Sequence, residues 1–171
     1  MKRFTLIVLL LTLAVPCLAS GQAQTAPPPK PGPEIQRLGF LVGTWKTESG
    51  SSSSTTNWEW FVGGFGVVGR EEGTDPGGKY SNLRVMTFDP VEKVYTHYMM
   101  TSVGPGGSLT KGTVAGNTWH WEWDGTVSGK PAKYRFTVVE VSPTATATKV
   151  EQSVAGGPWT VTSEGKGTKV K

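Results

Sequence analysis

Residues 118–125 read TWHWEWDG and contain three of the seven tryptophans of the chain. Successive side chains of an extended segment point to opposite faces, so this octet predicts a strand with two very different faces. One face carries the indoles of Trp119, Trp121 and Trp123, and the other carries the polar side chains of His120, Glu122 and Asp124. We expect the indoles to point into the protein and the polar side chains to face water.

The polar face of this strand also suggests a metal site, because a histidine and two acidic residues alternate along it. Side chains at positions i and i+2 stand about 7 Å apart on a pleated strand, which hinders three of them from converging on one ion. His97 is the only other histidine, and the spacing matches no established ligand pattern. We therefore expect neither a metal nor another cofactor.

Similar short segments follow one another through most of the chain, separated by turn residues such as GG, DPGG, DPVE and GPGG. Closely spaced strands and turns indicate an all-β meander, either a barrel or a sandwich. The connections are too short for parallel crossovers, so neighbouring strands should be antiparallel. We expect a single antiparallel β-barrel of about ten strands, spanning residues 43–49, 54–62, 65–72, 80–88, 92–102, 108–114, 117–124, 132–141, 144–154 and 158–168.

The N-terminal part of the chain has a different pattern. A basic start precedes the apolar run FTLIVLLLTLAV and a stretch of small residues, which is typical of a secretory signal peptide. We expect residues 1–19 to be removed on export to the periplasm or the outside of the cell. Residues 20–33 should form a proline-rich disordered linker, and residues 34–171 the barrel domain, which begins with one short helix.

Composition excludes several classes of function. Cys17 is the only cysteine, so the mature chain can form neither disulfides nor thiolate metal sites, and lipidation of Cys17 is disfavoured by Pro16 directly before it. Without Lys2 and Arg3, 15 basic and 13 acidic side chains remain, a net charge of +2 that is scattered along the chain. Such a distribution is unlike a nucleic-acid-binding surface.

The chain also lacks a G-x-S-x-G motif and a phosphate-binding glycine loop, so enzymatic activity is not indicated.

The segment FLVGTW at 40–45 resembles the opening of lipocalins and fatty-acid-binding proteins, the calycin barrels. In those families the tryptophan of the G-x-W motif, here Trp45, plugs one end of the barrel beneath the N-terminal turn, which implies a structural role. The span from about 34 to 169 more closely resembles a bacterial family of secreted lipocalin-like barrels of unknown function. Three further segments carry this resemblance: WEWFVGGFGVVGR at 58–70, VMTFDPVEKVYTHYMMTSVG at 85–104 and VEQSVAGGPW at 150–159.

The chain departs from its better-known relatives at their functional positions. Fatty-acid-binding proteins carry a helical lid after the first strand, where this chain has the polar segment SGSSSSTTN at 49–57. They also hold the fatty-acid carboxylate with an arginine and a tyrosine near the C-terminus, and TVTSEGKGTKVK at 160–171 contains neither. The haem-binding nitrobindins use a histidine near the C-terminus, whereas the last histidine here is His120. The resemblance therefore implies the fold and not these ligands.

Aromatic residues supply the candidate binding site. Trp58 and Trp60 alternate on one expected strand as Trp119 and Trp121 do on another, so the four indoles could fill the core or form one wall of a cleft. Three arginines lie among apolar neighbours, and an arginine inside a barrel requires an anion. Outward positions are expected for them, but if one points inward we expect Arg135. The candidate ligand-binding residues are Trp58, Trp60, Tyr98, Met100, Trp119, Trp121 and Arg135.

These features favour a protein that binds a small apolar or amphipathic molecule. Two alternatives stay open: an enzyme that uses His97 with an acidic or arginine partner, and a barrel with a filled core that acts as a protein-interaction module. A lumen without a cavity would favour the interaction module. A histidine with a shifted pKa inside a cavity would favour the enzyme.

Overall fold

The structure is a computed structural model and describes residues 29–61 and 63–171. The expected signal peptide at 1–19 and most of the expected linker lie outside the described residues. Within them, the chain begins with the five-residue helix α1 (Pro33–Arg37) and the 3-10 helix η1 (Leu38–Phe40), as the pattern at 34–43 predicts.

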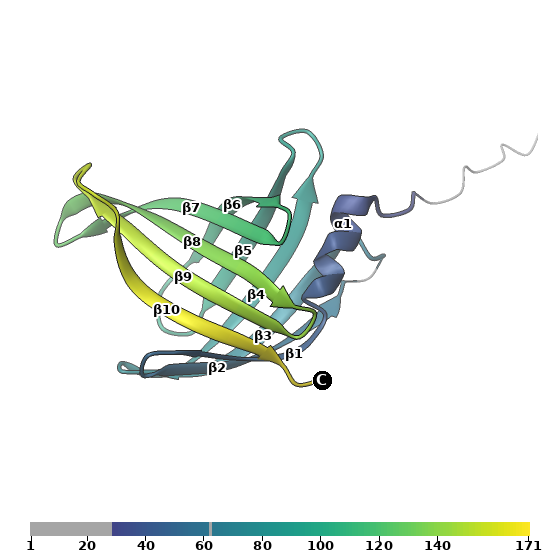
Figure 1. The fold of residues 1–171 in the computed structure, drawn as a ribbon, viewed down its shortest axis with the longest axis horizontal. Helices are drawn as coiled ribbons and strands as arrows, with labels where there is room; N and C mark the ends of the chain where they lie inside the picture. The colour runs from purple at the N-terminus through teal and green to yellow at the C-terminus, as the bar shows by residue number, and fades with distance from the viewer. Residues whose placement is uncertain (1–28, 62) are drawn as a thin grey trace, which may run out of the picture.

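Ten strands follow and make one closed sheet (Figure 1). They are β1 (Gly43–Ser49), β2 (Ser52–Trp60), β3 (Gly66–Asp75), β4 (Gly78–Asp89), β5 (Val94–Thr101), β6 (Gly107–Ala115), β7 (Thr118–Val127), β8 (Lys130–Ser142), β9 (Ala145–Val154) and β10 (Thr160–Lys169). Each expected strand corresponds to one of these, with ends displaced by no more than a few residues.

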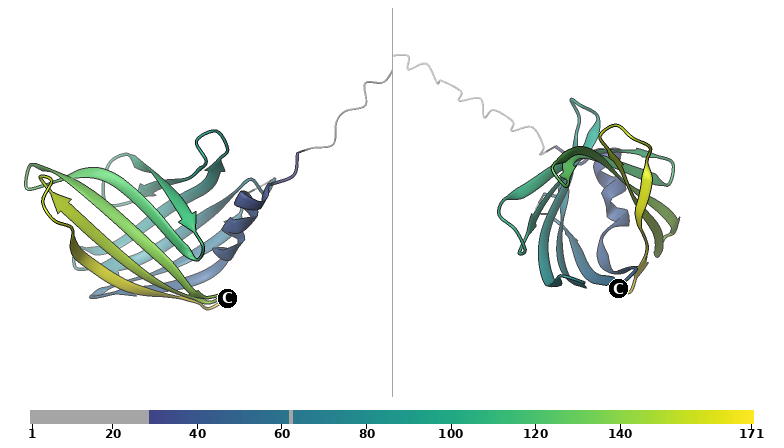
Figure 2. Two further views of the ribbon diagram at one scale, coloured as in Figure 1. Left: turned by 45° about the horizontal axis from the view of Figure 1, so that its top comes forward. Right: turned by 90° about the vertical axis from the view of Figure 1, so that its left-hand side faces the viewer.

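Each strand pairs antiparallel with the strands before and after it in sequence, and β10 pairs with β1 to close the barrel. In this closing pair Trp45 lies opposite Lys169. The expectation of an all-β antiparallel meander barrel is confirmed. Figure 1 shows α1 at one end of the barrel, and the right view of Figure 2 shows it within the ring that the strands form. We call this the closed end, and the end formed by the β1–β2 and β3–β4 hairpins the far end.

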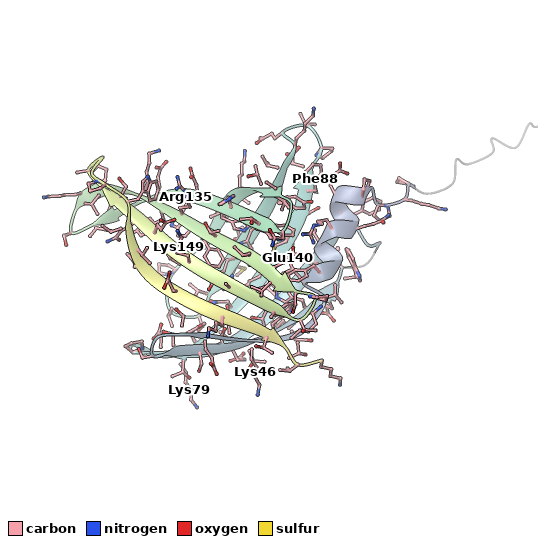
Figure 3. All side chains as sticks on the ribbon, viewed as in Figure 1. Lys46, Lys79, Phe88, Arg135, Glu140 and Lys149 are labelled. Atoms are coloured by element: carbon pink, nitrogen blue, oxygen red, sulfur yellow. The ribbon has the colours of Figure 1, made fainter. Side chains whose placement is uncertain are left out.

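The helical segment is fixed to the closed end by polar contacts at its two ends. Near its start, the Tyr95 hydroxyl donates a hydrogen bond to the backbone carbonyl of Glu34, and Arg37 forms an ion pair with Glu140. Glu140 lies near the end of β8 beside α1 (Figure 3), and its carboxylate also accepts a hydrogen bond from the indole N–H of Trp119. These contacts connect α1 to the buried wall of the barrel.

The other end of the helical segment is held by Trp45 and Lys169. The indole N–H of Trp45, which is buried, donates to the carbonyl oxygen of Leu41 at 2.7 Å. The ammonium of Lys169 donates to the carbonyl oxygens of Phe40 and Val42 at 2.7 and 2.9 Å. Backbone carbonyls at a helix end have no partner within the helix, so both contacts satisfy groups that would otherwise be unpaired.

The core lies beneath this helical segment. Leu38 and Val67 are fully buried there, and the core cluster also includes Trp58, Tyr95 and Trp119. Away from the closed end, polar and charged side chains cover much of the outer surface, and Lys46 and Lys79 point away from the barrel in Figure 3. No helix among residues 29–61 and 63–171 has the length and apolar composition required to cross a membrane.

Candidate functional site

The interior of the barrel contains two adjoining cavities of about 400 Å³ each. Both are lined by Phe40 and Leu41 at the closed end and by Trp58, Arg84 and Phe136 from the sheet. Since these residues border both spaces, the cavities are two halves of one lumen. Cavities of this size are typical of small-molecule sites.

One half of the lumen has an aromatic wall. Trp119, Trp121 and Trp123 line it from β7, and His97 and Met99 line it from β5. The rings of Trp119 and Trp121 are nearly parallel, with centroids 6.5 Å apart, and the ring of His97 meets Trp121 edge to face at 5.7 Å. The expectation that the indoles of TWHWEWDG point inward is confirmed. We refer to Met99, Trp119, Trp121 and Trp123 as the indole wall.

Glycines in the neighbouring strands make room for the inward rings. A Cβ atom on Gly112 would lie 2.4 Å from the ring of Trp121, and one on Gly69 would lie 2.8 Å from the ring of Trp58. Both distances are shorter than any real contact of a Cβ atom, so each ring lies directly over a backbone that lacks a side chain. Glycine covered by a cross-strand aromatic ring is a known device for stabilising sheets.

The other half of the lumen is lined mainly by hydroxyl groups. The serine- and threonine-rich segment at 52–56 forms part of β2, and alternation directs Ser54 and Thr56 inward. Thr148 from β9, Ser163 from β10 and the phenol of Tyr80 complete this side. We refer to these five residues as the hydroxyl wall. The lumen also reaches the partly exposed Ser49 and Ser52 of the β1–β2 hairpin, so it approaches solvent at the far end.

An ion pair lies between the two walls. The guanidinium of Arg84 donates two hydrogen bonds to a single oxygen of Glu71, at 2.9 and 2.6 Å, and the amide of Asn82 donates to the same oxygen at 2.7 Å. Burial alone would raise the pKa of the Glu71 carboxyl, but the charge of Arg84 and the hydrogen bonds from Asn82, Arg84 and Ser54 lower it below its ordinary value. Glu71 is therefore ionised at neutral pH and neutralises Arg84.

His97 lies in the indole half near this ion pair. Burial and the positive charge of Arg84 outweigh the opposing effect of Glu71 and lower the pKa of His97 to about 4. The imidazole is therefore uncharged at neutral pH. Its Nε2 atom is buried and has no hydrogen-bond partner among the described residues.

The structure brings together some of the expected site residues and separates others. Trp58, Trp119 and Trp121 line the lumen. Trp60 shares the inward parity of Trp58 but lies beyond the lumen, where its partly exposed ring approaches Gly39 in η1. No ligand contact is shown for any of these residues, so their role in binding stays a prediction.

Tyr98 and Met100, two of the candidate ligand-binding residues on β5, do not line the lumen. His97 and Met99 face the lumen, whereas Tyr98 and Met100 are exposed on the outer surface. Both parities of this strand carry large apolar side chains, so alternation alone could not decide between them. Gly107 lies beneath the Tyr98 ring, since a Cβ there would lie 2.4 Å from the Tyr98 hydroxyl. Glycines lie beneath rings on both faces of this barrel, so this glycine could not have indicated which way Tyr98 points.

Arg135 has the outward position that is favoured for the arginines, but the expectation that it would be the one to point inward is wrong. Arg135 lies on the outer face, where it pairs with Glu122 and its guanidinium stacks over the ring of Trp159 at 4.3 Å. The inward arginine is Arg84, one of the three arginines for which the sequence favours an outward position, and its partner Glu71 is not among the predicted site residues. Arg84 is flanked by Leu83 and Val85, two apolar residues that are partly exposed on the outside. Apolar residues are expected to point inward, so alternation predicts an outward position for Arg84.

The acidic face of β7 is on the outside of the barrel. Glu122 and Asp124 form surface ion pairs with Arg135 and Lys133, and His120 is exposed. Within residues 29–61 and 63–171, no three histidine, cysteine or acidic side chains are grouped so that they could hold a metal ion.

Comparisons with known proteins show a similarity of fold only. No protein-family model matches the chain, and no curated protein matches its sequence. The crystal structure of Rv2717c from M. tuberculosis matches with a TM-score of 0.52 and 12% sequence identity, over 83% of this chain and 100% of that one. The two proteins share a β-barrel. At this identity the likeness carries no information about ligands.

Proposed function

We propose that this barrel binds a small amphipathic molecule in its lumen. The observation that supports the proposal most is the lumen itself, whose two connected halves are bordered by the indole wall and the hydroxyl wall. A barrel that acted only through its surface would need no such space, and a filled core would leave none. The apolar part of the ligand would contact the indole wall, and its polar part would contact the hydroxyl wall.

His97 favours the enzyme as the second candidate function, since it lies in the cavity and its pKa is lowered. A base with a pKa of about 4 accepts protons poorly at neutral pH, because general bases work best with a pKa near the operating pH. The other ionisable groups near it, Arg84 and Glu71, are engaged with each other. Binding is therefore the function we favour.

Export is part of the proposal and rests on the sequence of residues 1–19 alone. The ligand would then be encountered in the periplasm or outside the cell, as for the secreted lipocalin-like barrels that the chain resembles. Mass spectrometry of the mature N-terminus tests this, with cleavage after Ala19 or Ala23 as the expected result. A diacylated Cys17 would contradict it.

Binding can be tested with 1-anilinonaphthalene, an uncharged apolar dye that fluoresces strongly when it leaves water. We expect saturable enhancement with energy transfer from tryptophan, and at least tenfold weaker binding in Trp121→Ala because a main contact surface is lost. Trp121→Phe should retain most of the affinity. Glu122→Gln, on the opposite face of the same strand, is the matched control and should bind as the wild type does.

The reverse result would contradict the proposed site. If Glu122→Gln abolishes binding while Trp121→Ala leaves it intact, the ligand contacts the outer face of β7. Absence of saturable binding by the folded wild-type protein would contradict the lumen as an apolar binding site. Native mass spectrometry of protein purified from its own organism would then identify any molecule that it retains.

A further inference from the structure

The lumen is bordered by four ionisable side chains: Glu71, Tyr80, Arg84 and His97. Arg84 places two of its N–H groups on one oxygen of Glu71, so the cation and the anion are in direct contact. Burial and the nearby negative charge of Glu71 raise the pKa of Tyr80, so its phenol is neutral, and the imidazole of His97 is neutral as well. The four groups sum to no net charge at neutral pH.

Charge compensation has a consequence for the ligand. An anionic group that entered the lumen would lose its hydration, and it could pair with Arg84 only by displacing Glu71. Displacement would leave the Glu71 carboxylate buried without its cation, since the side chain is 8% exposed. A cationic group would meet the same difficulty with Arg84. Neither sign of charge gains a free partner.

Uncharged polar groups, by contrast, find many partners. The hydroxyl wall offers the side-chain oxygens of Ser54, Thr56, Thr148 and Ser163, and a hydroxyl that already donates to a neighbour, as Ser54 does to Glu71, can still accept a hydrogen bond. The indole wall offers flat apolar surface on the other side of the same space. The lumen is therefore built for two kinds of neutral contact.

Resting on the proposed function, we infer that the ligand is an uncharged amphipathic molecule, with an apolar or ring-bearing part against the indole wall and hydroxyl, carbonyl or ether groups against the hydroxyl wall. Fatty acids and other organic anions are excluded as preferred ligands. The Glu71–Arg84 pair acts as the selectivity element, because each charge cancels the attraction that the other would exert on a charged ligand.

Two dyes that share one skeleton test this inference. 1-Anilinonaphthalene is uncharged, and 1-anilinonaphthalene-8-sulfonate carries one negative charge on the same rings. We expect the wild-type protein to bind the uncharged dye at least tenfold more tightly. In a competition assay, 1-dodecanol should displace the bound uncharged dye at lower concentration than dodecanoate does.

Variants of the charged residues then test whether the Glu71–Arg84 pair causes the preference for the uncharged dye. Glu71→Gln uncovers the charge of Arg84, so the ratio of the affinity for the sulfonate to the affinity for the uncharged dye should rise at least tenfold. The double variant Glu71→Gln/Arg84→Met removes both charges and should again prefer the uncharged dye. Glu59→Gln is the matched control, since it breaks the exposed Glu59–Arg70 pair on the outer face of β2 and β3. It should leave both affinities unchanged.

The outcomes separate this inference from the proposal on which it rests. If neither dye binds the wild-type lumen, the proposed function fails. If the sulfonate binds as tightly as the uncharged dye, and Trp121→Ala weakens both, the lumen binds ligands but the inference of an uncharged ligand is overturned. If Glu71→Gln does not fold, the wild-type ratio and the double variant still decide the question.

Discussion

His97 shows how burial can determine the charge of a single side chain. Its imidazole is buried beside the ring of Trp121 and lies close to the cation of Arg84, and both the burial and the cation disfavour a positive charge. Glu71 only partly offsets them, because its carboxylate is already paired with Arg84. The neutral ring therefore borders the lumen without adding a charge to it.

The lowered pKa of His97 predicts a loss of stability in mild acid. The unfolded chain binds a proton at this residue below about pH 6.5, whereas the folded protein binds it only near pH 4. Between these values protonation favours the unfolded state, so stability falls as the pH falls. From pH 7 to pH 5 we expect the free energy of unfolding to decrease by about 2 kcal/mol through this residue.

Urea unfolding at the two pH values measures this effect. His97→Gln should abolish most of the decrease, because the variant has no group at this position that titrates in the interval. Carboxyl groups titrate mainly below it and contribute little there. His120→Gln, at the exposed histidine, should show the wild-type decrease. Equal losses in the wild type and His97→Gln would show that His97 is not the group responsible.

Residue orientation was the part of the site that the sequence predicted least well. Trp119 and Trp121 were placed correctly because their strand alternates between large apolar and polar side chains. In β5 and around Arg84, the outer face is apolar as well, with Leu83, Tyr98 and Met100 partly exposed. The register between neighbouring strands decides which side chains of a strand face the lumen. The sequence of one strand does not contain this register when both of its faces are apolar.

At the scale of strand pairs, the aromatic–glycine contacts couple the shape of the lumen to the sheet. Gly112 in β6 lies opposite Trp121 in β7, and Gly69 in β3 lies opposite Trp58 in β2. Each glycine allows a ring to lie flat against the wall and leave space at the centre. Larger residues at these positions would push the rings into the lumen.

Gly112→Ala should therefore change both stability and the site. Its Cβ atom would overlap the Trp121 ring, and the ring would rotate into the cavity. We expect a loss of about 1–3 kcal/mol in the free energy of unfolding and a changed near-ultraviolet circular dichroism signal from the indole. Gly104→Ala is the control, since a Cβ there meets nothing within 4 Å. An unchanged signal and stability in Gly112→Ala would show that the Trp121 ring and the backbone at His120, whose oxygen lies 2.6 Å from the added Cβ, both have other positions available.

The strands themselves were well predicted because their ends are marked by turn chemistry. Turns rich in glycine, asparagine or aspartate separate the segments in which apolar and polar residues alternate. Such a turn predicts a hairpin whichever face of the strands is buried. The displaced ends, such as β2 at 52–60 against the expected 54–62, concern the polar segment at 52–53. Serine has no strong preference for strands, so only pairing with β1 identifies these residues as part of the sheet.

At the scale of the whole molecule, closure joins the two ends of the domain. Lys169 in the last strand donates hydrogen bonds to Phe40 and Val42 beside the first strand, and its ammonium lies 5.1 Å from the centroid of a Trp45 ring. Phe40 also lines the lumen, so this lysine helps to fix the closed end of the binding space. The closed end is therefore held by contacts that no local sequence pattern could reveal.

Lys169→Met should weaken the closed end, because it leaves two backbone carbonyls without their donor while it keeps a long apolar side chain. We expect the free energy of unfolding to fall by about 1–3 kcal/mol, measured by urea denaturation. Lys166→Met, at an exposed position of the same strand, should change it by less than about 0.5 kcal/mol. Equal effects of the two variants would show that the carbonyl contacts contribute nothing to stability.

The pairing of β1 with β10 also constrains when the protein can fold. The partners of the Lys169 contact to Phe40 are separated by 129 positions, so the barrel cannot close until nearly the whole chain is available. Contacts of such separation slow folding, because a long loop must be ordered before they form. A nascent chain of this protein would thus remain open during synthesis. If it is exported, as we propose, transport that starts before synthesis ends would act on a chain whose barrel is not yet closed.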